Sequence, residues 1–415
     1  MQDIWKSWTE VKKICSKKKK VILWGRSEDW VPKTTPKLKF SRDSYIVDSN
    51  PAYNGTSFEG LQIFLPEKLK EENKNDIYII ITGSVFQSIS KSLNDLGFEA
   101  GKHYCCTPAI RDWGLLQEIR EYDKNIIIAC SDYRDKSKKR FSKMGGGIYV
   151  YNTKDNELQK KISGHFRQII RVDDKYYTVE WVEKKVYVLS KDLNKIDEIM
   201  IDQTTDKSEK PNACGITYHD KKKLFFIANA GSDTINIYDK KNFKCIKTIH
   251  ISDKFLKVGD GQHHINDICV ADDTLLVSCF SISGYWKKGI LDGGILAFDI
   301  NNFDKGFDIL VKDLWMPHSV EFINGDICYL DSMRGELWIG NKKVEGRFPG
   351  FIRGLTYDNR FYYIGQSEAM YMGRLFRVKD NIMCNAGVYL FDIENKVSRF
   401  YSFPFLMNVH DILIQ

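Results

Sequence analysis

Two patterns of hydrophobic and polar positions divide the chain. Before residue 122, unbroken apolar runs alternate with segments whose apolar residues recur at helical spacing; the runs are Lys19 to Ser27, Ser44 to Pro51 and Asp76 to Ser84. Unbroken runs are typical of strands buried on both faces, and their alternation with helices is typical of a parallel sheet. The pattern predicts an α/β unit of Rossmann-like type over residues 1–122.

After residue 122 the pattern changes to short strands separated by tight turns. The clearest unit runs from Gly215 to Ile249 and holds four strands with turn residues between them, which is the pattern of one propeller blade. The third strand of such a unit recurs six times along the chain, beginning at Gly146, Lys185, Thr234, Gly293, Gly335 and Ala386.

The inner strands predict how the ring closes. Five copies precede the end of the chain, beginning at His165, Asn212, His264, Pro317 and Phe351, and the first unit has no copy of its own. The segment Asn408 to Gln415 is the sixth copy. We therefore predict an all-β six-bladed β-propeller over residues 123–415, closed by the C-terminal strand, which removes the exposed edges of an open sheet.

The inner strands begin with polar residues that a hydrophobic core would not hold. Because these strands all begin at one face of a propeller, their first residues should converge on one mouth of the central channel. Five of the eight histidines in the chain are among them. Long loops after the second strands of blades one, four and six should rise over the same mouth, where long loops on a rigid face usually bind ligands. The polar residues at the strand starts are His165, Arg167, Asn212, His263, His264, Asn266, Asp267, His318, Arg353, His410 and Asp411.

Three of these histidines, His264, His318 and His410, occupy equivalent positions in three inner strands. Neutral imidazoles there could transfer protons near neutral pH or ligate a divalent metal, with Asp267 as a catalytic or ligating carboxylate. The alternative is that each histidine only satisfies backbone groups that line a wet channel. We expect the three imidazoles and the Arg353 guanidinium to converge on one pocket, within about 10 Å of each other in the narrow bore of a propeller.

A second set of side chains is expected to bind the substrate. Arg353 offers a fixed positive charge suited to a carboxylate or a phosphate. Tryptophans and tyrosines could stack on sugar rings, although packing between blades is their commoner use. The predicted substrate-binding residues are Arg353, His263, Asn212, Gln366, Trp286 and Asp331.

Composition narrows the class of protein. The 62 basic residues are interleaved with 55 acidic ones, so a net charge of +7 indicates a mildly basic surface and no nucleic-acid partner. No apolar stretch approaches the ~18 residues needed to span a bilayer, and the N-terminus has no signal-peptide pattern. The ten cysteines show no CxxC spacing. Buried free thiols and a cytoplasmic location are expected.

The first apolar run ends in a loop that bears on cofactor binding. A dinucleotide fingerprint needs several glycines, and the loop from Gly25 to Trp30 has only one. Asp48, which lies 23 residues after Gly25, is where a ribose-binding carboxylate would stand. We expect no NAD site here. Through Val47 to Pro51 and Phe58 to Gly60, this region resembles Rossmann-like domains that accompany surface-polysaccharide biosynthesis proteins.

The segment from His263 to Asp392 resembles a family of bacterial proteins known as a conserved domain of unknown function. The resemblance supports a propeller and implies that this mouth is the site, but it implies no reaction. The Rossmann-like fusion departs from the simpler family members. The matching stretches are His263 to Asp267, Asp292 to Gly294, Met316 to Ser319, Leu330 to Ser332, Gly335 to Leu337, Phe348 to Phe351 and Arg353 to Leu355.

The expected function is that of an enzyme of surface-glycan or nucleotide-sugar metabolism. A carbohydrate-like small molecule would bind at the histidine-lined mouth and react by acid/base or metal-assisted chemistry. The alternative is a non-catalytic propeller that binds a glycan or serves as a scaffold for a partner protein. The N-terminal resemblance motivates the first reading, which is an analogy.

Overall fold

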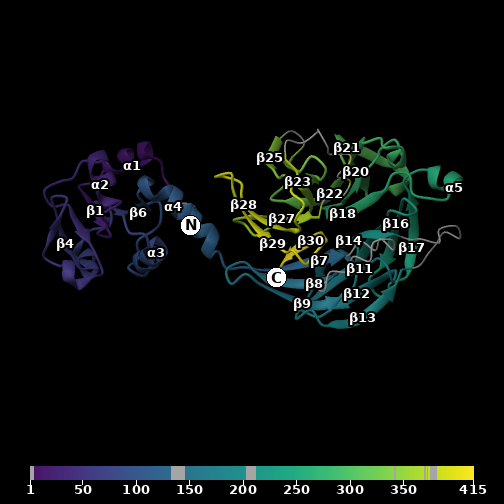
Figure 1. Ribbon diagram of the computed structural model, residues 1–415, viewed down its shortest axis with the longest axis horizontal. Coiled ribbons are helices and arrows are strands. Elements are labelled where there is room, and N and C mark those ends of the chain that lie inside the picture. The colour runs from purple at the N-terminus through teal and green to yellow at the C-terminus, as the bar shows by residue number, and fades with distance from the viewer. Residues whose placement is uncertain are drawn as a thin grey trace. The chain divides into compact units, whose positions relative to one another are not determined.

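The computed structural model describes residues 4–131, 145–201, 212–340, 343–368, 371, 373 and 381–415. The chain divides into two compact units, Met1–Glu121 and Tyr122–Gln415 (Figure 1). Within the described residues, no helix is long and apolar enough to cross a membrane.

The N-terminal unit is built on one mixed sheet with the strand order β3-β4-β2-β1-β5-β6. The strands are β1 (Lys20–Trp24), β2 (Tyr45–Val47), β3 (Ser57–Phe58), β4 (Leu61–Phe64), β5 (Ile77–Ile81) and β6 (Tyr104–Cys106). All pairs are parallel except β3 with β4. The α-helices are α1 (Trp8–Cys15), α2 (Val31–Thr34), α3 (Phe86–Asp95) and α4 (Arg111–Glu121).

Gly25, after β1, allows two backbones to approach. Its φ is +108°, and a Cβ there would lie 2.6 Å from the backbone nitrogen of Gly83, just beyond β5. Since real Cβ atoms do not come so close, the glycine packs one strand end against another. The conformation needs no ligand to explain it.

The second unit is a six-bladed β-propeller, which confirms the prediction for this part of the chain. Each described blade is a four-stranded antiparallel sheet. Blade one is β30 (Asn408–Ile414), β7 (Asn125–Ser131), β8 (Gly147–Asn152) and β9 (Glu157–Ser163); blade two is β10 (Phe166–Val172), β11 (Lys175–Glu180), β12 (Lys185–Leu189) and β13 (Lys195–Met200); blade three is β14 (Ala213–His219), β15 (Leu224–Asn229), β16 (Thr234–Asp239) and β17 (Cys245–His250).

The remaining blades follow the same order from the inner to the outer strand. Blade four is β18 (Ile265–Ala271), β19 (Thr274–Cys279), β20 (Gly293–Asp299) and β21 (Phe307–Leu314); blade five is β22 (Pro317–Ile323), β23 (Asp326–Asp331), β24 (Glu336–Ile339) and β25 (Lys343–Arg347); blade six is β26 (Phe351–Tyr357), β27 (Tyr362–Ser367), β28 (Gly387–Asp392) and β29 (Val397–Ser402). A short helix, α5 (Lys254–Val258), precedes blade four.

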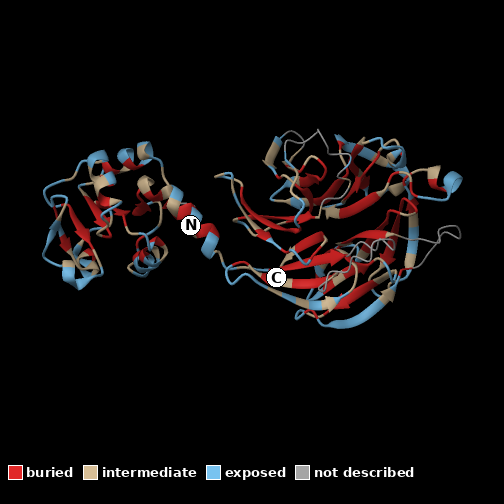
Figure 2. Ribbon diagram, in the orientation of Figure 1, coloured by how far each residue is buried: buried red, intermediate tan, exposed pale blue. Residues whose placement is uncertain are grey.

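The ring closes as predicted, with the last strand in the first blade. β30 pairs antiparallel with β7, from Asn408 opposite Ser131 to Ile414 opposite Ile126. In Figure 1 the yellow β30 lies beside the blue β7, so chain segments far apart in sequence share one sheet. The inner strands are the most buried in the propeller, and the outer ones are largely exposed (Figure 2).

Every inner strand carries a β-bulge near its start. The register with the second strand shifts between Phe166 and Ile169, and again at the same place in each of the other five blades. A bulge places an extra residue in one strand and re-aims the side chains there. The side chains at the strand starts therefore do not alternate strictly between the two faces of the sheet.

Below the mouth, side chains of one inner strand bind the backbone of the next. The Asp411 carboxylate accepts the Ile169 N–H at 2.9 Å, and Asp267 accepts the Ser319 N–H at 2.8 Å. The Ser319 hydroxyl in turn accepts the Gly354 N–H at 2.8 Å. These bonds run around the ring and satisfy backbone groups that the bulges leave unpaired.

Candidate functional site

A cavity of about 180 Å³ opens at the mouth where the inner strands begin. Four of the residues expected to converge there, His264, His318, His410 and Arg353, all line it, and so does Asn212. The full lining is Ser131, Arg167, Trp181, Asn212, His264, Asn266, Phe280, His318, Phe351, Arg353, Tyr371, Asn408 and His410.

Two kinds of strand end supply this lining. The first residues of all six inner strands contribute Arg167, Asn212, His264, His318, Arg353 and His410, among others. The antiparallel second strands end at the same level, and there they contribute Ser131, Trp181 and Phe280. Each blade therefore adds to the cavity.

Arg353 is the most firmly held charge in the cavity. The residue is only 3% exposed. Its guanidinium donates to the Ser367 hydroxyl at 2.7 Å and to the Asn408 amide oxygen at 2.9 Å. Burial lowers the pKa of Arg353 to about 9, and the nearby charge of Arg167 adds to the effect. The group still carries its charge at neutral pH.

His410 is held in one tautomer by its neighbours. Arg353 Nη1 lies 3.2 Å from His410 Nδ1, and because a guanidinium can only donate, Nδ1 must accept. The proton of the neutral ring is then on Nε2, 2.7 Å from the Ser131 hydroxyl. Burial lowers the pKa of His410 well below its usual range, with Arg353 adding to the effect. Ser131 thus accepts a bond from the histidine, which is the reverse of an activated serine nucleophile.

His318 presents the opposite tautomer. Its Nδ1 lies 3.0 Å from the Met316 carbonyl oxygen and 2.8 Å from the Ser332 hydroxyl. A carbonyl oxygen can only accept, so Nδ1 carries the proton and Nε2 keeps its lone pair. Burial lowers the pKa of His318 well below its usual range, and the Arg353 charge contributes. The arrangement suits a neutral proton acceptor.

His264 is packed against two aromatic rings. The centroid of its ring lies 4.3 Å from that of Phe280 and 4.5 Å from that of Trp286. Burial in these surroundings lowers the pKa of His264 to about 3. Its backbone has a φ of +53°, and its N–H donates to the Asp233 carboxylate at 2.8 Å. This carboxylate, from blade three, fixes a conformation that costs a non-glycine residue energy.

The cavity is electropositive. Arg167 and Arg353 both line it, and none of the described lining residues is an aspartate or a glutamate. Arg167 lies over the ring of Trp181, with 5.0 Å from Cζ to the ring centroid. The Nε groups of these two side chains, Arg167 Nε and Trp181 Nε1, are buried with no hydrogen-bond partner among the described residues. Buried donors without an acceptor are costly, and an acceptor-rich ligand would relieve that cost.

Carboxyl groups lie on the inner strands outside this lining. Asp267, expected to be catalytic, does not line the cavity: its carboxylate accepts the Ser319 N–H in the next blade. Burial raises the pKa of Asp267 to about 6 and that of Glu321 to about 8. The pKa of Asp411 is also raised, first by burial and then by the charge of Glu321. We assign Asp267 to the ring of bonds that holds the blades together.

Four predicted substrate-binding residues also lie outside the cavity lining. His263 uses both ring nitrogens, on the Ser252 hydroxyl at 2.7 Å and the Ser281 carbonyl oxygen at 2.9 Å. Gln366 is fully buried and bonds Asn385 O and the Tyr389 hydroxyl. Asp331, also fully buried, accepts from the Trp315 N–H and from Arg334. Trp286 reaches the site only indirectly, by packing on His264.

The metal-ligating role expected for His264, His318 and His410 finds no support among the described residues. Among the described residues there is no group of three or more His, Cys, Asp or Glu side chains that could hold a metal ion. Two of the imidazoles are engaged elsewhere: His410 accepts from a guanidinium, and His264 packs against Phe280 and Trp286. Two arginines in the lining would also repel a cation.

Several lining residues were not expected, notably Ser131, Trp181, Phe280 and Phe351. Aromatic residues beside strand ends are indistinguishable from core residues in the sequence. Comparing the residues that follow the second strands across blades, as was done for the inner strands, would have found Trp181 and Phe280. The long loops of blades one and six that were expected over the mouth lie mostly outside the described residues.

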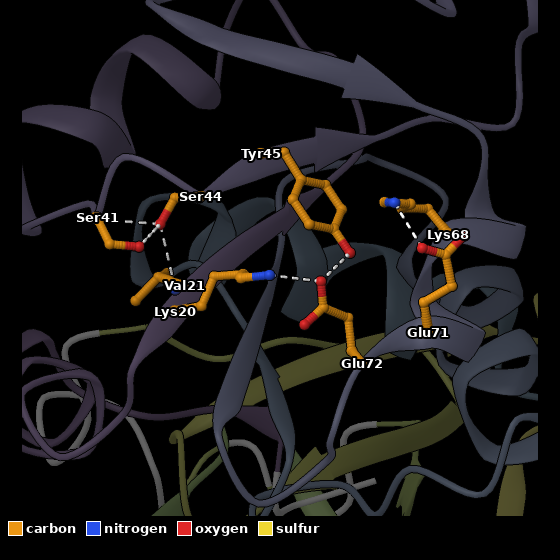
Figure 3. A network of polar contacts seen from close by, with 8 residues as sticks. All are labelled: Lys20, Val21, Ser41, Ser44, Tyr45, Lys68, Glu71 and Glu72. Carbon is orange, nitrogen blue, oxygen red and sulfur yellow. Dashed lines mark hydrogen bonds and ion pairs between the residues drawn. The ribbon is translucent and has the colours of Figure 1, made fainter.

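The N-terminal unit has one large open hollow, of about 1140 Å³, at the amino ends of β1, β2 and β4. The Lys20 ammonium and the Tyr45 hydroxyl both donate to Glu72, at 2.6 and 3.0 Å, and Lys68 pairs with Glu71 (Figure 3). These carboxylates already have protein partners. Four of the charged residues that line the hollow therefore form two ion pairs within the protein.

At the opposite edge of the same sheet, Asp48 is also engaged. Its carboxylate accepts the Arg26 N–H at 2.7 Å and the Asn50 N–H at 2.8 Å. The Arg26 guanidinium lies over the rings of Phe58 and Tyr53, at 4.4 and 4.9 Å. The place where a dinucleotide would need a ribose-binding carboxylate is thus occupied by contacts within the protein.

Comparison with known proteins gives one family and several distant structural likenesses. A chain in the crystal structure of a nidogen/laminin complex has 14% identity and a TM-score of 0.48, covering 70% of this chain and 98% of that one. A protein of unknown function from Bacteroides caccae has 11% identity and a TM-score of 0.46, over 70% and 98% of the two chains. A putative gluconolactonase has 12% identity and a TM-score of 0.40, over 59% and 80%. Likenesses this distant carry no information on function.

No curated protein matches the chain. The model of the family described as Domain of unknown function (DUF4915) matches residues 164–404, which is more than half of the chain and most of the propeller. The chain therefore belongs to the DUF4915 family.

Proposed function

We propose that the propeller is an enzyme that binds a small, negatively charged, carbohydrate-like molecule at its mouth and acts on it by proton transfer. The observation that carries the proposal is the composition of the cavity: two arginines and three histidines line it, with no carboxylate among its described lining residues. Such a cavity favours an anion, and its imidazoles supply proton acceptors.

The two arginines would bind the anionic group. Arg353 is held in place by Ser367 and Asn408, so it loses little freedom when a ligand binds. The buried Nε–H of Arg167 has no acceptor among the residues that the structure describes. A planar guanidinium matches the geometry of a carboxylate or a phosphate.

His318 is the proposed general base. Its Nε2 would take a proton from the substrate, and the negative charge left on a substrate oxygen would be stabilised by Arg353. Because burial lowers the pKa of His318, the ring is neutral at pH 7, and the bond from Nδ1 to Met316 O leaves the lone pair on Nε2. The same proton would return from Nε2 to the product or to water.

The size of the cavity limits the substrate. At about 180 Å³ it is smaller than the 300–1,000 Å³ of ordinary drug-sized pockets, so a single sugar ring suits it better than a nucleotide sugar. The rings of Trp181, Phe280 and Phe351 offer apolar faces for such a ligand. A role in surface-glycan synthesis rests on the resemblance of the N-terminal unit.

The proposal is tested with glucuronate and glucose, which differ in the carboxylate, by calorimetry at pH 7.5. We expect glucuronate to bind and glucose not to, and Arg167→Gln to weaken glucuronate binding at least tenfold. Proton transfer is tested by deuterium exchange into the bound acid in D₂O. His318→Asn, which keeps a donor near Met316 O, should abolish exchange, while His219→Asn, outside the cavity, should not.

Two results would contradict the proposal. Equal binding of the neutral and the acidic sugar would show that the arginines do not select an anion. Binding of the acid without exchange would favour the alternative of a non-catalytic glycan-binding propeller.

We also propose that the N-terminal unit is a Rossmann-like domain that has lost its nucleotide site. The parallel strands β4-β2-β1-β5-β6 follow the order of the first five strands of the Rossmann fold, 3-2-1-4-5, which supports the assignment. The contacts of Asp48 support the loss of the site. A micromolar dissociation constant for NAD by calorimetry, abolished by Asp48→Ala, would refute it.

A further inference from the structure

Two neighbouring loops form an exposed surface beside blade four. The first contains α5 and runs from Ser252 to Gln262; the second runs from Ser283 to Asp292 and contains the 3-10 helix η6 (Trp286–Lys288). In Figure 1, α5 projects from the propeller, and in Figure 2 it is largely exposed. We call these two loops the α5–η6 surface.

This surface leaves several apolar side chains largely exposed. Leu256 is 55% exposed, Val258 62%, Ile290 43% and Tyr285 39%. The other strongly exposed aliphatic residues of the propeller stand mostly on outer strands, as Ile196, Ile246 and Ile309 do. Single exposed aliphatics are ordinary, but a group at the tips of two joined loops indicates an interaction surface.

Lysines accompany these apolar residues. Lys254 and Lys288 lie over the Tyr285 ring, 3.7 and 4.8 Å from its centroid. Lys257 pairs with Asp253, and Lys287 pairs with Asp260. The two loops hold four lysines and three acids, Asp253, Asp260 and Asp292, so the α5–η6 surface has a net charge of +1, on a chain whose net charge is +7.

The two loops are held as one rigid piece. Phe255 anchors α5 in the core at 1% exposure, and the Trp286 indole N–H donates to Gly261 O at 3.2 Å. The Lys254 ammonium donates to the Ser283 carbonyl oxygen. The Ser252 hydroxyl binds His263, next to the inner strand of blade four. The exposed side chains are therefore displayed by an ordered scaffold.

We propose that the α5–η6 surface docks the protein on the surface of an anionic lipid bilayer. Aliphatic side chains enter the boundary between headgroups and acyl chains, aromatic rings lie at the headgroup level, and lysines bind anionic phosphates. Lysine is depleted in protein–protein interfaces, so the same composition fits a protein partner less well. The charge of the patch complements the negative charge of the lipids.

Docking would bring the cavity close to the membrane. Trp286 belongs to this surface and also packs on His264, which lines the cavity. A molecule carried at the bilayer surface would then reach the mouth without crossing bulk solvent. The docking itself does not depend on the proposed chemistry.

The experiment is co-sedimentation of the full chain with vesicles of phosphatidylcholine alone or with a third of phosphatidylglycerol. We expect binding only to the anionic vesicles, with at least a tenfold loss of affinity at 0.5 M NaCl. L256S/V258S and Lys257→Glu/Lys288→Glu should each lower the affinity at least tenfold. The matched control, Ile196→Ser/Met200→Ser on β13, removes equally exposed apolar residues and should bind like the original chain.

Three results would overturn the proposal. One is equal binding to both vesicle types, and another is unchanged binding by the L256S/V258S variant when its thermal melting is unaltered. The third is a concentration-dependent dimer that the same two substitutions abolish, because the surface would then bind a second copy.

Discussion

At the scale of single residues, burial determines which groups carry charge. In the cavity it keeps the three imidazoles neutral while the guanidinium of Arg353 stays charged. The histidines and Arg353 could be predicted from the sequence because polar residues recur at strand starts. What could not be predicted is which of two neighbours faces the cavity: His264 lines it and His263 does not. His264 has a positive φ that the Asp233 carboxylate holds, and the sequence gives no sign of this backbone conformation.

Glu321 gives a prediction for stability against pH. Its pKa is raised to about 8, so between pH 4.5 and 8 the folded chain keeps a proton that the unfolded chain has lost. Stability contributed by this group is therefore lost as the pH rises, at about 1.4 kcal/mol per unit. Glu321→Gln should lose less stability than the original chain between pH 5 and pH 8.

Urea unfolding at the two pH values measures this difference. Glu157→Gln, on the exposed edge strand β9, should behave like the original chain. If Glu321→Gln shows the same change between pH 5 and pH 8 as the original chain, the carboxyl is ionised in the fold and the assignment is wrong.

At the scale of strands, the six inner strands were predictable because the same sequence pattern recurs in each blade, so each copy strengthens the assignment of the others. Their start positions in the sequence match the observed elements within one or two residues. The bonds between them were not predictable. Gln168, from blade two, donates to Ile268 O at 2.9 Å and accepts the Ile216 N–H at 3.0 Å, so one side chain ties three blades. Such a role depends on distances across the channel that sequence spacing does not contain.

Gln168→Ala is therefore expected to destabilise the propeller by about 2–4 kcal/mol, because buried backbone N–H groups of Ile216 and Ile268 lose their acceptor. Thermal unfolding measures the effect. Gln159→Ala, in the exposed strand β9, is the matched control and should change little. A similar melting temperature for both variants would mean that water replaces the amide at no cost.

At the scale of the whole molecule, closure was predictable by counting: five inner strands for six blades left one place for the last strand. The N-terminal unit was less predictable, since its sheet proved to be mixed, with β3 antiparallel to β4. With only two residues, β3 is too short to show a hydrophobic pattern that predicts a strand.

Closure predicts a strong effect of breaking the last strand. Ile412 is 1% exposed, and it pairs with Ile128 of β7. Ile412→Asp places a charge between the two ends of the ring, and we expect insoluble protein or the loss of cooperative melting. Ile246→Asp, at a 56% exposed position of β17, should melt like the original chain. If Ile412→Asp stays folded and melts within a few degrees of the original chain, the pairing of β30 with β7 contributes little to stability.

The strand that closes the ring also supplies Asn408 and His410 to the cavity, opposite Ser131 from β7. A molecule that contacts residues of both strands would hold β30 and β7 together. Separation of β30 from β7 would require the molecule to dissociate first. Ligand binding in the cavity and separation of these two strands are therefore linked by mass action. The rate at which a protease cuts β30 would then fall as a correct ligand is added. That rate gives a screen for the natural ligand that needs no knowledge of the reaction.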